Sequence, residues 1–423
     1  MISQIQIQNY KSITRQTLDL GRVNVFIGEN GSGKSNILEA IALAGAAAGG
    51  KLDSEFLASR GIRTTSPQKM RPAFCHDNDC TPITVAVRKP GMTTAVYEMQ
   101  NDNAPYSKWQ LTRRNQVVDF TKFILDLKEA SLVYPEERSL QCFRNSMREA
   151  FSSIEKIGSE NGTAIKIDFP KNGKFMEILQ SALIPNNQID QNLAQFIIYS
   201  PENSSLRTTY REGQIEPLGI NGEGVFRLLS LYLRSAGVDS AGASYGLPAE
   251  SASRALASIK NSLQMLDWFD DLRLAAFPEE SLEVKDRFLA SNHAFLDYSS
   301  TNEGFLFLLF YFLLLSSDLT PPFFAIDNID ASLNPKLCER LTIELVHLSK
   351  LNAKQLILTT HNPAVLDGLD LNDDDQRLFI ISRNRKGETR IKRFRKAAGA
   401  GSAQPRMSEL FLRGMIGGLP KSF

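Results

Sequence analysis

Short hydrophobic runs alternate with amphipathic stretches along this chain, most clearly at its two ends. Three strands are predicted near the start, at residues 2–7, 18–20 and 23–27. The third is hydrophobic almost throughout, as expected of a buried strand, and leads directly into Gly28. The Ala-rich stretch Asn36–Ala47 then predicts a helix. This part of the chain therefore follows the order strand, loop, helix.

The last third of the chain has the most regular pattern. It predicts in order a helix, a strand, a helix, a strand and a hairpin, at residues 303–316, 323–326, 335–348, 355–359 and 377–394. Strands that alternate with helices imply an α/β fold. The apolar run in the first helix is shorter than the about 20 residues needed to cross a bilayer, so we expect a buried helix.

Between these ends the pattern changes twice, which suggests four segments. A hairpin at 81–99 closes the first lobe, the next stretch is polar with helical periodicity, and a Gly/Ala-rich linker follows the last strand. We predict an N-terminal lobe (1–99), an inserted, mostly helical subdomain (100–195), a C-terminal lobe (196–396) and a linker with a C-terminal docking segment (397–423).

Composition narrows the class of protein only slightly. Hydrophobic residues make up 42% and charged residues 22% of the 423, which is ordinary for a globular protein. The net charge is +1, so any nucleic-acid surface has to be a local basic patch. Four cysteines are too few for a disulfide framework, and the N-terminus lacks the pattern of a signal peptide. We expect a cytoplasmic protein that does not associate with a membrane.

A glycine-rich loop carries the clearest chemistry. GENGSGKS, at Gly28–Ser35, fits G-x-x-x-x-G-K-[ST] between a buried strand and a helix. In such a loop the backbone N–H groups converge on phosphate, the lysine reaches the terminal phosphate oxygens, and the hydroxyl coordinates Mg²⁺. We predict ATP and Mg²⁺ as cofactors. The predicted nucleotide-binding residues here are Gly28, Glu29, Asn30, Gly31, Ser32, Gly33, Lys34, Ser35 and Asn36.

A carboxylate at the end of a neighbouring buried strand has to complete such a site. Asp327 follows the apolar run 323–326 and is predicted to hold Mg²⁺ together with Ser35. Asn328 comes next, and an amide cannot accept a proton at neutral pH. Hydrolysis is therefore expected to be slow or to use another base, for which Asp330 is nearest.

A histidine follows the next predicted strand. One strand–helix–strand unit separates Asp327 from His361, so both are expected at the edge of the sheet that carries the glycine-rich loop. His361 is placed to hydrogen-bond the terminal phosphate of a bound nucleotide. With Asp327, Asn328 and Asp330 it completes the predicted catalytic set.

Four motifs in this order resemble the ATPase heads of the RecF and structural-maintenance-of-chromosomes (SMC) group. They are IQNYKSI at the start, GENGSGKSN (28–36), IDNIDASLNP (326–335) and LTTHNPAVLD (358–367). More narrowly, they resemble the AAA-type ATPases related to overcoming-lysogenization-defect (OLD) proteins of bacterial defence operons. The resemblance covers residues 1–50 and 280–395 and implies an α/β head of the ABC/SMC type with a mixed β-sheet.

The resemblance also implies that two heads close on ATP, with a signature L-S-x-G of one head capping the nucleotide of the other. Thr301–Gly304 stands at the matching place, 23 residues before Asp327, with Asn302 where the family has serine. Asn302 and Gly304 are therefore predicted to bind the nucleotide of a partner head. The same residues also fit a plain helix N-cap. Asp330 falls where the family has its D-loop, at the dimer interface.

Two further signals carry less weight. Cys75, His76 and Cys80 could form a metal clip, but no second ligand pair follows. The densest basic cluster follows residue 382 and is typical of a solvated face, with contact to a phosphate backbone or to an acidic partner as the alternative. Its members are Arg383, Arg385, Lys386, Arg390, Lys392, Arg393, Arg395 and Lys396.

Our leading hypothesis is a regulatory ATPase subunit of a bacterial antiphage system that forms a homodimer or higher oligomer through ATP. Since no nuclease, hydrolase or zinc-enzyme motif is present, we expect a separate effector, a nuclease or a toxin. The alternative is a RecF/SMC-like DNA-repair ATPase that clamps DNA. A transporter ATPase is a weaker alternative, because no aromatic adenine-stacking loop and no clear Q-loop glutamine are present, Gln68 being a poor candidate.

Overall fold

The computed structural model describes most of the chain. The described residues are 1–74, 80–90, 94–105, 107–116, 187–208, 216–237, 247–275, 281–291, 293–395 and 405–417. Two units are present, one formed by Met1–Pro90, Ala95–Arg114 and Gln188–Phe423, the other by Gly91–Thr94 and Asn115–Asn187. The second unit lies almost entirely outside the described residues, and so do the helices predicted within residues 117–186.

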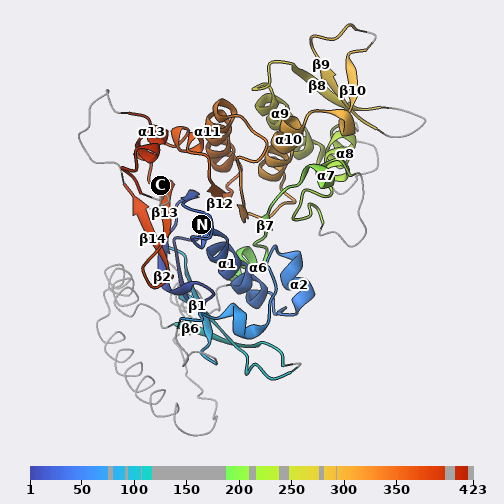
Figure 1. Cartoon of the computed structure of the whole chain (residues 1–423). Coiled ribbons are helices and arrows are strands. Elements are labelled where there is room, and N and C mark those ends of the chain that lie inside the picture. The colour runs from blue at the N-terminus through green and yellow to red at the C-terminus, as the bar shows by residue number, and fades with distance from the viewer. Residues whose placement is uncertain are drawn as a thin grey trace, which may run out of the picture. The chain divides into compact units, whose positions relative to one another are not determined.

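A six-stranded sheet forms the centre of the first unit. Its strands in order are β14 (Thr389–Phe394), β13 (Gln376–Arg383), β3 (Val23–Ile27), β12 (Gln355–Thr360), β11 (Phe323–Ile326) and β7 (Ile198–Tyr199). All neighbours are parallel except the β13–β14 hairpin. The N-terminal strand β3 therefore lies between two C-terminal strands, as the blue and red ribbons of Figure 1 show. This arrangement confirms the predicted α/β fold.

A second sheet holds five strands. Their order is β2 (Ile13–Asp19), β1 (Gln4–Tyr10), β4 (Ile83–Arg88), β5 (Thr94–Gln100) and β6 (Gln110–Gln116). The β4–β5 pair is antiparallel, in agreement with the predicted hairpin. Because β6 extends the sheet, the N-terminal lobe continues past residue 99, where we had placed its boundary. This strand was not predicted, because its residues are mostly polar and lack the apolar alternation of a buried strand.

The helices α1 (Lys34–Ala48) and α6 (Asn187–Ala194) lie against each other. A Cβ at Gly45 would come within 2.3 Å of the Leu193 carbonyl oxygen, so only glycine allows this contact. Residues 188–195, which we had assigned to the insertion, therefore belong to the first unit. Short helices complete this region, α2 (Ser54–Ser59) and the 3₁₀ turn η1 (Pro67–Met70).

The remaining helices surround α10 (Glu303–Ser316), which lies at the centre of the hydrophobic core. All residues from Phe305 to Ser316 are buried, which confirms the buried helix expected from the apolar run. Its neighbours are α7 (Asn203–Leu206), α8 (Val225–Ala236), α9 (Ala249–Leu263) and α11 (Pro335–Leu351). A three-stranded sheet, β8 (Phe269–Leu274), β9 (Leu282–Asp286) and β10 (Phe295–Asp297), precedes the 3₁₀ turn η3 (Tyr298–Ser300).

The C-terminal segment packs on the first unit. Helix α13 (Met407–Leu412) contacts α12 (Ala364–Asp367), where the Ser408 backbone N–H donates to the Asp367 carboxylate at 2.9 Å. Phe411 is buried, whereas Leu412 is 64% and Met415 69% exposed.

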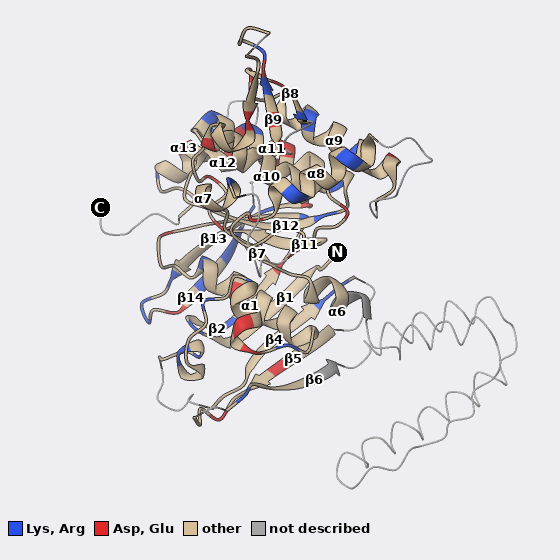
Figure 2. Cartoon of the chain, turned by 90° about the vertical axis from the view of Figure 1, so that its right-hand side faces the viewer, with Lys and Arg blue, Asp and Glu red and all other residues tan. Residues whose placement is uncertain are grey.

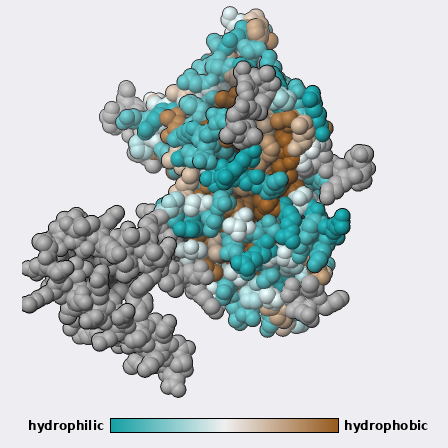
Figure 3. Space-filling model, turned by 90° about the vertical axis from the view of Figure 1, so that its left-hand side faces the viewer, coloured by the Kyte–Doolittle hydropathy of each residue, from teal (hydrophilic) through white to brown (hydrophobic). Residues whose placement is uncertain are grey.

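Figure 3 shows a hydrophobic area on one face, between hydrophilic surfaces. None of the described helices is long and apolar enough to cross a bilayer.

Candidate nucleotide-binding site

The glycine-rich loop connects β3 to α1, in the predicted strand–loop–helix order. A Cβ at Gly28 would lie 2.0 Å from the Ile381 carbonyl oxygen of β13, the strand beside β3. Gly33 has a φ of 107°, and a Cβ there would lie 2.1 Å from Thr389 Oγ1. Both glycines are therefore required by close approach of the β13–β14 hairpin, and at Gly33 the backbone angle adds to this requirement.

A hydroxyl network fixes the loop against distant segments. Thr389 Oγ1 donates to the Ser32 carbonyl oxygen at 3.0 Å and lies 2.6 Å from Ser12 Oγ. Asn36 Nδ2 donates to Ser12 Oγ at 2.7 Å. Asn36 therefore holds the first turn of α1 against the β1–β2 turn, a positioning contact that the motif alone does not indicate.

The loop residues fit a triphosphate. Lys34 is 6% exposed, and its Nζ donates to the carbonyl oxygens of Gly28 at 2.7 Å and Glu29 at 3.0 Å. Burial lowers the pKa of Lys34 to about 8, against the raising effect of Asp327 and Asp330. The Ser32 hydroxyl is buried and has no hydrogen-bond partner within the described part of the chain. An unpartnered donor beside a desolvated lysine suits an anionic ligand.

The carboxylate of Asp327 lies beside the loop, as predicted. Asp327 follows β11, and its Oδ2 accepts a hydrogen bond from Ser35 Oγ at 3.2 Å. Its other oxygen accepts from the Thr359 hydroxyl of β12. Thr359 thus fixes the carboxylate so that one oxygen faces Ser35. A serine hydroxyl and a carboxylate oxygen are the hard oxygen ligands that Mg²⁺ prefers.

Asn328 is exposed next to this pair. Its φ of 57° lies in the left-handed region, which asparagine tolerates better than most residues. The Asn328 backbone N–H donates to Thr359 Oγ1 at 2.9 Å, so the same threonine fixes both residues after β11.

Asp330 and His361 are brought together at the end of β12. Asp330 Oδ1 accepts from Thr360 Oγ1 at 2.6 Å and from the His361 backbone N–H at 3.4 Å. Partial burial and the nearby Lys34 charge lower the pKa of His361, which keeps the imidazole neutral at pH 7. A neutral ring has one donor and one acceptor, as a sensor of the terminal phosphate needs.

These residues surround a cavity of about 440 Å³. The lining includes the predicted Asn30, Gly31, Ser32, Gly33, Lys34, Ser35, Asn36, Asp327, Asn328 and His361. Gly28, Glu29 and Asp330 do not line it: Gly28 and Glu29 precede the loop crest, and Asp330 faces Thr360. The cavity lies at the carboxyl ends of β3, β11 and β12, the usual ligand edge of such sheets.

Two arginines in the lining were missed from the sequence. Arg383 ends β13, and we had counted it only in the basic cluster. Its place at the end of a strand parallel to β3 was a usable signal, because such strands end at the same edge of the sheet. Arg63 is ion-paired through Nε to the buried Glu39 at 2.5 Å. The sequence around Arg63 does not indicate a role in the cavity, because its partner Glu39 lies in another element, α1.

Asn302 and Gly304 do not line this cavity. Asn302 is the N-cap of α10, and its Oδ1 accepts from the Phe305 backbone N–H at 2.9 Å. The helix-cap interpretation is therefore realised within this chain. Asn302 is exposed, and the neighbouring Glu303 accepts from the Ser332 hydroxyl.

The basic cluster lies mainly on the β13–β14 hairpin, and Figure 2 shows Lys and Arg along β14. Several of its charges are paired within the chain, Arg390 with Glu388 at 2.8 Å and Arg393 with Asp374 at 2.9 Å. The discounted metal clip, Cys75, His76 and Cys80, lies outside the described residues except for Cys80. Among the residues that are described, no group of three or more His, Cys, Asp or Glu could hold a metal ion.

Family models match two segments that together span less than half of the chain. Residues 1–56, with the glycine-rich loop, match an AAA ATPase domain. Residues 238–367, with Asp327 and His361, match an AAA domain described as "putative AbiEii toxin, Type IV TA system". No curated protein matches the chain. The two segments meet at the cavity, which supports an ATPase of the AAA type.

Solved structures with a similar fold include SMC head domains. An Smc head bound to the C-winged helix domain of ScpA has 15% identity and a TM-score of 0.50, over 93% of this chain and 97% of that chain. The SMC head of Thermotoga maritima has 14% identity and a TM-score of 0.45, over 93% and 99%. A Pyrococcus furiosus Smc head complex has 14% and 0.46, over 93% and 96%. The chain therefore has an SMC head-like fold with mixed α/β sheets.

Proposed function

We propose that this chain is the ATP-binding and ATP-hydrolysing regulatory subunit of a bacterial antiphage defence system, related to the OLD-type ATPases. Its heads pair through ATP and control a separate effector, a nuclease or a toxin. The observation that carries the ATPase part is the Ser35–Asp327 contact of 3.2 Å beside Lys34.

The residues of this site have separate tasks. Lys34 and the loop N–H groups bind the phosphates, while Arg63 and Arg383 add positive charge to the cavity wall. Ser35 and Asp327 hold Mg²⁺, which neutralises phosphate charge when bound. His361 is neutral and donates to the terminal phosphate. Asp330 is a substitute base only after movement, since its carboxylate faces Thr360 and the His361 backbone.

Slow hydrolysis follows from Asn328. The exposed amide beside Asp327 cannot take a proton from the attacking water, so the ATP-bound state is long-lived. A long-lived state suits a protein whose nucleotide state is read by another protein better than a motor with rapid turnover.

Head pairing is supported by the position of the start of α10 relative to the nucleotide cavity. Asn302 and Gly304 lie away from the cavity of their own chain, at the exposed N-terminus of α10. A helix N-terminus favours an anion. We therefore assign them to the nucleotide of a second copy, and Asp330 to the same interface.

The defence role is supported by the toxin–antitoxin description of the family model over residues 238–367. The Smc head bound to a winged-helix domain of ScpA illustrates that this fold can dock a protein. In this chain the exposed Leu412, at the end of α13, and Met415, just after it, are the candidate docking residues. A cytoplasmic location is part of the proposal.

A DNA-clamping repair ATPase is the second candidate, favoured by the exposed Arg390 and Lys392 of the β13–β14 hairpin. Affinity purification separates the two. A nuclease-like or toxin-like protein that co-purifies stoichiometrically supports the defence role. A lone dimer whose ATPase rate rises with duplex DNA supports the alternative. The Lys34→Ala variant is the control, because it removes the phosphate contact; unchanged assembly and ATP turnover in this variant would contradict both.

A further inference from the structure

A second cavity lies at the opposite end of the central strands. Its volume is about 480 Å³, and its walls come from the segments that precede β11 and β12, from β7, and from the residues around Arg60 and Glu216. Thr320–Pro322 lead into β11, and Asn352–Lys354 lead into β12. The nucleotide cavity lies where these same strands end. The two cavities are therefore separate sites joined by two short strands.

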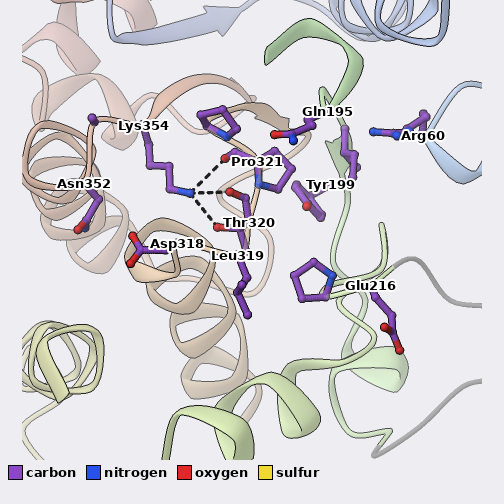
Figure 4. Close-up of a pocket in the computed structure, with 14 residues that line it drawn as sticks. Arg60, Gln195, Tyr199, Glu216, Asp318, Leu319, Thr320, Pro321, Asn352 and Lys354 are labelled. Carbon is purple, nitrogen blue, oxygen red and sulfur yellow. Dashed lines mark hydrogen bonds between the residues drawn. The ribbon is translucent and has the colours of Figure 1, made fainter. Parts of the chain in front are cut away.

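Two deeply buried polar side chains line this second cavity. Tyr199 is fully buried, and its hydroxyl has no hydrogen-bond partner in the part of the chain that is described. Lys354 is 5% exposed, and its Nζ donates to the carbonyl oxygens of Thr320 at 2.7 Å and Pro321 at 3.3 Å. In Figure 4 they approach residues 320–321 from opposite sides. A buried unpartnered hydroxyl is unfavourable by about 1–3 kcal/mol, so its retention requires an explanation.

Arg60 supplies a positive charge to this cavity. Its Nη1 makes one long hydrogen bond, 3.5 Å, to the Phe196 carbonyl oxygen, and its guanidinium lies 4.7 Å from the centre of the Phe56 ring. No carboxylate is ion-paired with Arg60 among the described residues. Burial lowers the pKa of Arg60, and the charge interaction with Tyr199 acts in the opposite direction.

Both acidic groups of the cavity have partners within the chain, and the charge of Asp318 also acts on Lys354. Glu216 forms an ion pair with Arg227, and Asp318 Oδ2 accepts a hydrogen bond from Ser251 Oγ at 2.6 Å. All three N–H donors of Lys354 have acceptors, since Thr320 Oγ1 lies 3.0 Å from its Nζ. The polar groups left for a ligand are therefore the Arg60 guanidinium, the Tyr199 hydroxyl and the exposed Gln195 amide, and each of them can donate a hydrogen bond.

We propose that this cavity is a binding site for a small oxyanion, a molecule with a carboxylate or phosphate group that accepts hydrogen bonds from Tyr199 and Arg60. The ligand's oxygen atoms satisfy the Tyr199 hydroxyl and pair with Arg60. The prolines and Leu319 in the lining contact the ligand's carbon skeleton.

This site is connected to the nucleotide site by one peptide unit. The Tyr199 carbonyl oxygen accepts from the Asp327 backbone N–H at 2.8 Å, and the Ile197 carbonyl oxygen accepts from Ala325 N–H at 2.9 Å. A ligand that shifts Tyr199 therefore acts on the strand that positions Asp327. This coupling rests on the proposed ATPase function, whereas oxyanion binding does not.

Oxyanion binding is tested by calorimetric titration of the Lys34→Ala chain. This variant is used because the glycine-rich loop of the unchanged chain would itself bind phosphate. Inorganic phosphate and succinate serve as probes, and saturation by one or both is expected; the probe that saturates identifies a tetrahedral or a planar oxyanion. Adding Tyr199→Phe should weaken the affinity at least about 10-fold, as loss of a hydrogen bond to a charged group does. Arg60→Gln should have a similar effect, whereas Arg254→Gln, at an exposed arginine on α9, should have none.

Thermal unfolding of the same proteins excludes a folding defect. Tyr199→Phe should unfold at the same or a higher temperature, because the unpartnered hydroxyl is removed. Absence of saturable binding by either probe, or equal affinity in Tyr199→Phe, would overturn the site. The coupling is tested in the chain with Lys34 intact. The effect of the probe on ATP affinity should be at least about 3-fold larger in this chain than in Tyr199→Phe, a difference of under 1 kcal/mol. An unchanged ATP affinity would overturn the coupling alone.

Discussion

Single side chains in the nucleotide site are fixed by residues far away in the chain. Thr359 contacts both the Asp327 carboxylate and the Asn328 backbone, so one hydroxyl fixes the two residues that follow β11. The pKa of His361 is likewise lowered by partial burial and, to a smaller extent, by Lys34 from the glycine-rich loop. At this scale, chemistry is decided by which groups the fold brings together.

Asn328→Glu should accelerate ATP hydrolysis by about 100-fold in single-turnover assays, because a carboxylate can accept the proton of the attacking water. The positive φ at this position should reduce stability by about 1 kcal/mol. Asn328→Gln is the matched control, since it has the size of glutamate without the base. Equal rates for the two variants would mean that this position does not limit hydrolysis.

The burial of Lys354 predicts a pH dependence of stability. Its pKa is lowered to about 8, below the ordinary 10.5, so between these pH values the unfolded chain holds a proton that the folded chain has lost. The contribution of Lys354 to stability therefore rises with pH across this window. Relative to Lys354→Met, the unfolding free energy should rise by about 2 kcal/mol between pH 7.5 and 9.5 in urea denaturation. Parallel curves for both proteins would contradict the shift.

At the scale of elements, the glycine-rich loop is held between α1 and the β13–β14 hairpin. Thr389 on β14 contacts both the loop carbonyl of Ser32 and the hydroxyl of Ser12. The hairpin that carries the basic residues is therefore also the support of the nucleotide site. Any ligand that moves β14 acts directly on the loop.

Two glycines of the loop provide a matched test of this support. Gly33→Ala places a Cβ 2.1 Å from Thr389 Oγ1, whereas a Cβ at Gly31 meets nothing within 4 Å. Both have positive φ, 73° at Gly31 and 107° at Gly33, so both substitutions strain the backbone, more so at Gly33, and only Gly33→Ala adds a clash. We expect ATP affinity to fall about 10- to 100-fold in Gly33→Ala, and much less in Gly31→Ala, in a fluorescent-nucleotide titration. Similar losses in both would show that strain alone limits binding.

At the scale of the whole molecule, the predicted nucleotide set divides into two groups. Most of it lines one cavity, whereas Asn302 and Gly304 lie at the start of α10, outside that cavity. On the proposed function, these two residues bind phosphate away from the nucleotide of their own chain, so a second copy has to supply that nucleotide. The assembly is therefore expected to depend on ATP.

Asn302→Asp should prevent ATP-dependent association without unfolding the chain. Aspartate is as good an N-cap as asparagine, but it places a negative charge against the partner's phosphate. Asn334→Asp is the matched control, because Asn334 caps α11 through the Leu337 N–H at 2.9 Å in the same way. Light scattering with ATP and Mg²⁺ should show a larger species for the Asn334→Asp chain only. A larger species for both would remove Asn302 from the interface.

Local patterns were enough to predict several elements from the sequence alone. Helix 303–316 and strand 323–326 have the predicted bounds, because an unbroken apolar run between polar residues admits few other structures. The loop Gly28–Ser35, Asp327 and His361 could be placed at one sheet edge, because parallel strands with helical crossovers end on the same side. Strand β6 was missed because its residues are mostly polar.

Tertiary structure alone decided which distant groups meet. The contact of Thr389 with Gly33 joins residues more than 350 positions apart, and no local pattern indicates it. The insertion of β3 between β12 and β13 likewise depends on pairing energies across the whole sheet. The cavity with Tyr199, Arg60 and Lys354 arises where three separate segments converge. The sequence determined the strands and the phosphate loop, because these depend on neighbours along the chain; the fold decided the rest, because packing depends on neighbours in space.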